Sequence, residues 1–339
     1  MDVFPVNWDS VPEVMNKEQF FRICHISKST ALHLLKSGKV PCEWSGKKTR
    51  CYKIRKEDVK AYLPFLWAVN KLNPEYKVTA VITDIPEFYD MHQVSSFRKL
   101  LRRIHCKIVY HFMARVNRFI LLTEQMAVPL HVGDRPYLVM EGMCGDVADE
   151  PPVSKPQPFS MLYTGRLNRR YGIELLLQAM KELPDPDIEL WLCGSGEMEE
   201  EIRTYAAQDS RIRFFGFLPH EEAVQLQKQA TVLVNPRTNQ GEYTKYSFPS
   251  KTMEYMASGR PVMMFRLDGI PGEYDPFLTY IPEESAASIR NTVESLRELS
   301  PSELDAMGAR GRDFVLKNKN RNVQMHRVLD FIHKEQSNA

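Results

Sequence analysis

The second half of the chain predicts an α/β fold in which a parallel sheet carries helices on both faces. Short apolar segments that suit buried strands alternate with segments of helical apolar spacing. The helical segments are long enough to form right-handed crossovers between parallel strands. Glycines follow the predicted strands, and ligands in such sheets bind beyond the carboxyl ends of the strands. A ligand site is therefore expected where the glycines fall.

The expected elements alternate regularly between residues 159 and 265. The first strand runs into Gly165 and Arg166, and the second ends in Gly194-Ser195-Gly196. The expected strands are 159–167, 188–193, 212–218, 231–235 and 261–265, and the expected helices are 172–180, 197–207, 221–229 and 249–258.

Residues 246–262, with the sequence YSFPSKTMEYMASGRPV, are the most informative segment. Pro249 and Ser250 suit the start of a helix and Gly259 suits its end, so structure alone explains most of these letters. It does not explain Glu254, which lies mid-helix among apolar neighbours. A helix N-terminus offers N–H groups to a diphosphate, and a carboxylate one turn further in can accept hydrogen bonds from ribose hydroxyls.

This segment resembles the nucleotide-binding half of the retaining, two-domain glycosyltransferases of the family-4 type, which have the GT-B fold. The resemblance implies a nucleotide-sugar donor, with Arg166 on the diphosphate, Leu218 near the base and Glu254 on the ribose. Alternatives remain, because glycines also form tight turns and Arg166 also suits a solvated loop. The implied donor-binding residues are Gly165, Arg166, Gly194, Gly196, Leu218, Ser250, Lys251 and Glu254.

The chain departs from the family pattern at two positions. The family carries a Glu eight residues before the helix Glu, where this chain has Tyr246, and Glu242 lies four residues too early to replace it. The family's Lys before the glycine of the following helix is Tyr171 here, beside Arg170. Nucleotide binding is therefore expected more firmly than turnover.

Residues 64–150 resemble an incomplete acceptor-side domain of the same enzymes. Strands are expected at 78–87, 118–126 and 137–142, and a linker is expected at the Pro-rich segment 150–158. Asp84 is a catalytic candidate together with Glu254, although Asp also favours turns. No segment ahead of residue 78 resembles the first strands of a complete acceptor-side domain. We expect slow or undetectable transfer by the chain alone, and either self-association or low kinetic competence. A partner chain and the small N-terminal module are the two alternatives for covering the exposed strand edge.

Residues 1–63 predict a small winged helix-turn-helix that resembles the excisionase type. Asn16 and Ser27 suit helix caps, and a hairpin is expected to turn at Ser45-Gly46. Residues 16–62 contain twelve Lys and Arg against four Asp and Glu, a basic patch that suits DNA phosphates; a protein-interaction module is the alternative. The expected DNA contacts are Ser27, Lys28, Ser29, Thr30 and His33 in the second helix and Lys47, Lys48 and Arg50 in the wing.

Composition and charge bear on the compartment of the protein, on membrane association and on metal binding. The 339 residues carry a net charge of +2 and contain six Cys without a Cys-x-x-Cys pair, which suits reduced thiols in the cytoplasm. No apolar run reaches the roughly 20 residues of a membrane span. The scattered His residues predict no metal, and no cofactor is expected. Residues 97–108 predict a basic amphipathic helix, which suits either the inner face of a membrane or packing on the sheet.

Together these features predict a retaining glycosyltransferase that uses a nucleotide-sugar donor. The expected acceptor is a polysaccharide or a lipid-linked saccharide, and the domains are 1–63, 64–150 and 151–339. A DNA-binding regulator whose α/β part binds a nucleotide-sugar without turnover is the alternative.

Overall fold

The structure, a computed structural model, divides into two compact units. One unit comprises Met1–Thr79 and Ser96–Arg118, and the other comprises Ala80–Ser95 and Phe119–Ala339. The residues that the structure describes are 11–23, 28–36, 40–44, 46, 52–57, 59, 77–86, 106–107, 109–111, 113–145 and 158–334.

The first unit contains two short helices and a three-stranded antiparallel sheet. The helices are α1 (Lys17–Ile23) and α2 (Lys28–Lys36), and the sheet has the order β1-β3-β2, with β1 (Val14–Met15), β2 (Glu43–Trp44) and β3 (Tyr52–Arg55). Asn16 Oδ1 accepts hydrogen bonds from the backbone N–H groups of Glu18 and Gln19, which confirms the predicted cap. Strand β1 was not expected from the sequence.

Most of the expected DNA-contacting residues fall where the structure gives no description. Ser27, Lys47, Lys48 and Arg50 lie outside the described residues, as do the side chains of Ser29, Thr30 and His33. The side chain of Lys28 is largely exposed and lies 3.8 Å from Glu18. The helix-turn-helix and its DNA contacts stay predictions. The linker 150–158, apart from its last residue, and nearly all of the basic helix 97–108 are also outside the description.

A small sheet in the middle of the chain has the order β4-β5-β6, where β4 is Thr79–Ile82, β5 is Arg118–Leu121 and β6 is Tyr137–Val139. Strands β5 and β6 are parallel. Each strand lies within a predicted segment but is shorter than predicted. A short 3-10 helix, η3 (Glu124–Ala127), follows β5.

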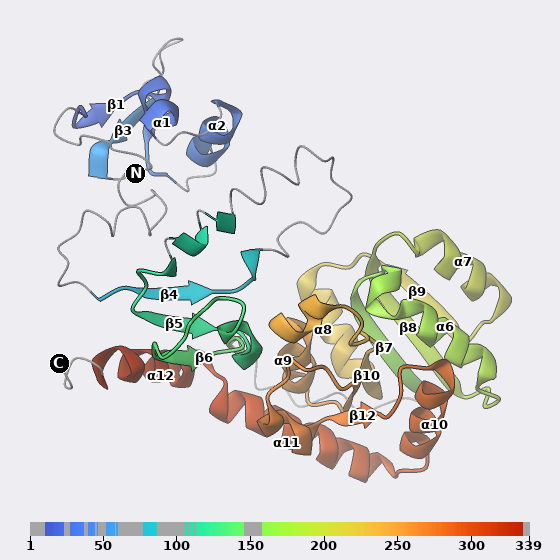
Figure 1. Ribbon diagram of the computed structural model, residues 1–339. Coiled ribbons are helices and arrows are strands. Elements are labelled where there is room, and N and C mark those ends of the chain that lie inside the picture. Colours follow the sequence, from blue (N-terminus) through green and yellow to red (C-terminus); the bar gives the residue numbers. More distant parts are fainter. Residues whose placement is uncertain are drawn as a thin grey trace. The chain divides into compact units, whose positions relative to one another are not determined.

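The second half of the chain forms a six-stranded parallel sheet of order β12-β11-β10-β7-β8-β9 (Figure 1). The predicted α/β fold is confirmed. The strands are β7 (Phe159–Arg166), β8 (Ile188–Ser195), β9 (Ile212–Gly216), β10 (Val232–Asn235), β11 (Val262–Phe265) and β12 (Thr279–Ile281). The helices between them are α6 (Ile173–Glu182), α7 (Glu199–Gln208), α8 (His220–Gln229) and α9 (Ser250–Ala257).

Alternate residues of each strand enter opposite cores, because successive side chains of a strand point to opposite faces. Met161 and Tyr163 pack with α6, α7 and α10 (Ala286–Arg297), whereas Leu162 packs with α8 and α9. The near-continuous apolar strands of the sequence follow from burial on both faces.

The last two helices connect the six-stranded sheet to the small sheet. Helix α11 (Pro301–Asn318) begins at a Ser300 capping box and packs on α9. Helix α12 (Arg321–Lys334) lies beside β6 (Figure 1), where Arg327 Nη2 donates to the Val139 carbonyl oxygen at 3.1 Å and Gln324 Nε2 donates to that of Gly142 at 2.7 Å. No described helix is both long and apolar enough to span a membrane.

A buried ion cluster lies at the point where α11 ends. Lys319, whose side chain is 2% exposed, places Nζ 2.5 Å from Glu141 Oε1 and 2.5 Å from Glu273 Oε1. Tyr274 donates to the same Glu141 oxygen at 2.6 Å. Burial and the neighbouring Glu141 carboxylate raise the pKa of Tyr274. Glu141 follows β6, Glu273 and Tyr274 lie between β11 and β12, and Lys319 follows α11. This cluster therefore joins the two sheets.

Candidate functional site

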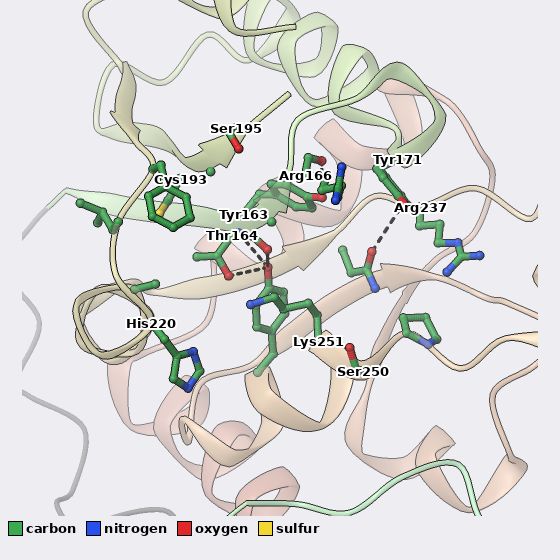
Figure 2. A pocket seen from close by; sticks show the side chains of 18 of the residues that line it. Tyr163, Thr164, Arg166, Tyr171, Cys193, Ser195, His220, Arg237, Ser250 and Lys251 are labelled. Atoms are coloured by element: carbon green, nitrogen blue, oxygen red, sulfur yellow. Dashed lines mark hydrogen bonds between the residues drawn. The ribbon is translucent and has the colours of Figure 1, made fainter. Parts of the chain in front are cut away.

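A cavity of about 730 Å³ opens at the carboxyl ends of β7, β8, β9 and β10 and at the start of α9 (Figure 2). Six of the eight expected donor-binding residues line it. Glu254 lies beside the lining residue Lys251, and Gly196 lies one residue beyond the lining residue Ser195 with its N–H donated to Glu199 Oε1 at 3.0 Å. The six are Gly165, Arg166, Gly194, Leu218, Ser250 and Lys251.

Glycine is required where β7 and β8 leave the sheet. Gly194 has φ of +140°, and a Cβ atom there would overlap the carbonyl oxygen of Gly165 on the neighbouring strand. The two backbones therefore approach more closely than any side chain allows. This close approach forms one wall of the cavity.

Arg166 directly follows Gly165 on the edge of the cavity. Its exposed side chain forms no hydrogen bond or ion pair with any residue that the structure describes. Its backbone is fixed, because Tyr163 donates its hydroxyl to the Arg166 carbonyl oxygen at 2.9 Å. Figure 2 shows Arg166 and Tyr171 on the same side of the cavity. The guanidinium is thus available to an anionic ligand.

Helix α9 brings Lys251 and Glu254 together behind its first turn. Lys251 Nζ donates to Glu254 Oε1 at 2.8 Å, and the buried Gln227 donates Nε2 to the same oxygen at 2.6 Å. Glu254 is therefore the anion that pairs with Lys251 in this structure. Glu254 Oε2 accepts no hydrogen bond from any described residue.

The environment keeps Glu254 ionised. Burial raises the pKa of this carboxyl group, but the hydrogen bonds from Lys251 and Gln227 and the charge of Lys251 outweigh burial, so the net pKa is lowered. A carboxylate can only accept hydrogen bonds. Its unengaged oxygen therefore suits a hydroxyl donor.

A pair of hydrogen bonds fastens α9 to β7. Tyr255 is fully buried and donates its hydroxyl to the Thr164 carbonyl oxygen at 3.0 Å, while the Thr164 N–H donates back to that hydroxyl at 2.8 Å. Arg166 on β7 and Lys251 on α9 are consequently held on one rigid framework.

The two ends of the cavity differ in chemistry. Phe217, which is 77% exposed, Leu218 and Ala223 form an apolar end after β9. Asn235, the last residue of β10, and Arg237, two residues beyond it, lie at the other end. Sequence reasoning did not select these two residues or His220, which also lines the cavity. The available signal was the position of Asn235 and Arg237 at the end of an apolar strand.

The remaining candidates lie elsewhere. Asp84 follows β4, is exposed, accepts a hydrogen bond from Thr83 Oγ1 at 3.3 Å and does not line the cavity. Tyr246, in place of the family's Glu, donates its hydroxyl to Glu242 at 3.3 Å. No group of three His, Cys, Asp or Glu suited to a metal ion occurs within the described part of the chain.

The fold and the cavity define an α/β protein whose parallel strand ends form a cavity lined by Arg166, Arg237 and Lys251. Residues 158–297 match the family model of the group 1 glycosyl transferases. This segment is therefore similar to the group 1 glycosyl transferases, and its parallel sheet has the GT-B type of fold.

Curated relatives are similar over part of the chain. The putative colanic acid biosynthesis glycosyltransferase WcaL of Escherichia coli K12 is 26% identical over 180 residues, which are 51% of this chain and 44% of that protein. A D-inositol 3-phosphate glycosyltransferase of Corynebacterium diphtheriae is 34% identical over 122 residues, 33% of this chain and 27% of that protein. The chain thus spans less than half the length of these relatives.

Solved structures share the fold at low sequence identity. Sucrose-phosphate synthase from Thermosynechococcus elongatus has a TM-score of 0.57 and 18% identity, covering 81% of this chain and 72% of that one. Anabaena HepE in complex with UDP-glucose has a TM-score of 0.53 and 12% identity, covering 76% and 72%.

Proposed function

We propose that this protein transfers a glycosyl group from a nucleoside diphosphate sugar to a polysaccharide or lipid-linked acceptor, with retention of anomeric configuration. One observation carries the proposal. The cavity is lined by Arg166, Arg237 and Lys251, and no Asp or Glu occurs among its described lining residues. Such a lining suits the negative charge of a diphosphate.

The chemistry follows from where charge develops. The acceptor oxygen bonds to the anomeric carbon from the face that the diphosphate leaves, which retains the configuration. The bond from that carbon to the diphosphate breaks, and the proton of the acceptor hydroxyl passes to the Asp84 carboxylate. Negative charge then grows on the departing diphosphate, where Arg166, Lys251 and the N–H groups at the start of α9 would stabilise it. Glu254 Oε2 would accept a ribose hydroxyl and fix the nucleoside.

The names of two similar proteins support a nucleotide-sugar donor and a saccharide acceptor. WcaL is named for colanic acid biosynthesis, and the HepE structure contains UDP-glucose. Retention is implied by the resemblance of residues 246–262 to the family-4 type. Asp84 is proposed to act on the acceptor, because it follows a strand of the small sheet, which resembles the acceptor-side domain of these enzymes.

Calorimetric titration with UDP-, GDP- and ADP-sugars, followed by product analysis on lipid-linked and polysaccharide acceptors, tests the proposal. We expect one nucleotide to bind, and NMR to show the donor's anomeric configuration in the product. Asp84→Asn is expected to lower transfer at least tenfold while donor affinity stays unchanged, since general acid–base groups contribute about 10²–10⁴-fold.

Asp134→Asn is the matched control, because Asp134 is an exposed Asp that precedes β6 and does not line the cavity. Absence of binding to any nucleotide sugar would exclude the proposed function. An inverted product would remove retention alone, and undiminished transfer by Asp84→Asn would remove Asp84.

A further inference from the structure

The order of strands arranges the cavity as a line. Strand β7 lies between β10 on one side and β8 and β9 on the other. Arg166 at the end of β7 therefore occupies the middle. The apolar Phe217 and Leu218 after β9 occupy one end, and Arg237 after β10 occupies the opposite end. Figure 2 shows Arg237 and His220 on opposite sides of the cavity, in keeping with this order.

A nucleotide sugar is also a line of three parts, with the diphosphate in the middle. If the proposed function holds, the diphosphate lies at Arg166 and the start of α9. The flat apolar faces of a base suit Phe217 and Leu218. The glycosyl group then falls at the β10 end, beside Arg237.

Arg237 carries a charge that the protein leaves uncompensated. Its Nη2 donates to Ser247 Oγ at 2.9 Å, and its guanidinium lies 5.2 Å from the ring centre of Tyr243. Its Nε is buried without a hydrogen-bond partner, and it forms no ion pair with any described residue. A guanidinium has five N–H donors and a delocalised charge, so most of its capacity is unused.

No carboxylate of the protein neutralises Arg237 within the cavity, because none of the described lining residues is Asp or Glu. Tyr246 is engaged with Glu242, which does not line the cavity. A neutral sugar would leave the charge of Arg237 unmatched, whereas a carboxylate would neutralise it through the exposed side of the guanidinium.

We propose that the glycosyl group of the donor is acidic, a sugar that carries a carboxylate as in a nucleoside diphosphate uronate, and that Arg237 binds this carboxylate. This inference rests on the proposed function and narrows its substrate class. It assigns Arg166 to the diphosphate and Arg237 to the sugar, two separable tasks for two arginines of one cavity.

Calorimetry with matched donor pairs tests the inference on the full chain. UDP-glucose is compared with UDP-glucuronate and GDP-mannose with GDP-mannuronate, since each pair differs only in oxidation at the sugar's sixth carbon. For the base that binds, we expect the uronate to bind about tenfold more tightly, the range of one charge-assisted hydrogen bond. Arg237→Gln is expected to abolish this preference while the affinity for the nucleoside diphosphate stays unchanged.

Two further variants separate the outcomes. Arg166→Gln should weaken both members of a pair and the nucleoside diphosphate equally, and Arg310→Gln, an exposed arginine of α11 that does not line the cavity, should change nothing. Equal affinity for both members of the pair that binds overturns the acidic sugar. A loss of nucleoside diphosphate affinity in Arg237→Gln overturns the assignment, because Arg237 would then contact phosphate. Failure of every donor to bind overturns the proposed function itself.

Discussion

Strands β7 and β8 of the six-stranded sheet carry Gly165 and Gly194 one residue before their ends, whereas strands β5 and β6 of the small sheet are followed by Thr123 and Glu141. The two glycines permit a close approach of the backbones and line the cavity. Thr123 instead donates Oγ1 to the Lys245 carbonyl oxygen at 2.9 Å, and Glu141 accepts from Tyr274 and pairs with Lys319. The strand ends of the six-stranded sheet thus line a cavity, whereas those of the small sheet form contacts that join the two sheets.

The largest effect is expected from removing the charge of Lys319, which pairs with Glu141 between the two sheets. Lys319→Met leaves the buried Glu141 carboxylate without its cation, and removing one partner of a buried pair costs about 3–5 kcal/mol. We expect a large fall in the urea midpoint of unfolding. Lys317→Met, an exposed lysine two residues earlier in α11, is the control. Equal midpoints for the two variants would show that the cluster does not stabilise the junction.

The opposite experiment removes ligand-binding groups at the other strand ends. Arg166→Ala and Glu254→Ala should each weaken nucleoside diphosphate binding roughly tenfold or more, since a charge-assisted hydrogen bond contributes about 1.5–3 kcal/mol. Calorimetry measures the affinity, and urea unfolding should show that Arg166→Ala leaves stability unchanged. Arg310→Ala is the control. Unaltered affinity in both variants would remove these residues from the site.

The smallest expected effect is a pH dependence of stability that arises from Glu254. Its folded-state pKa lies below the ordinary value of 4.5. It therefore contributes stability that is present above pH 4.5 and is lost as the pH falls through the folded pKa. The difference in unfolding free energy between the protein and Glu254→Gln should stay constant from neutral pH to about 4.5 and shrink below it. Glu200→Gln, an exposed residue of α7, should show no such change; a difference that grows in acid would contradict the sign.

Local patterns made residues 159–265 predictable. The strands there read as short apolar runs because they are buried in the sheet, and the helices are amphipathic. The spacing of the apolar residues therefore distinguishes the strands from the helices. The glycines and Arg166 were found because they directly follow strands. Strand β1 was missed because two residues carry no period, and no element was predicted after residue 265.

Contacts between distant parts of the chain were not predictable. Lys319 and Glu141 meet only because α11 returns to the small sheet, and neither residue shows a local pattern that indicates burial. Arg237 lies in the irregular segment 236–249, where spacing predicts no side-chain direction. Its role in the cavity emerges from the order of strands in the sheet, which the sequence alone does not specify.

The hydrogen bonds between Tyr255 and Thr164 have a consequence for the kinetics of donor capture. They join the helix that carries Lys251 and Glu254 to the strand that carries Arg166, so the phosphate-binding groups keep their spacing before any ligand arrives. Little configurational entropy is then lost on association. Capture of the nucleotide should be limited by diffusional encounter, and its rate should fall with ionic strength as the arginines' long-range attraction is screened.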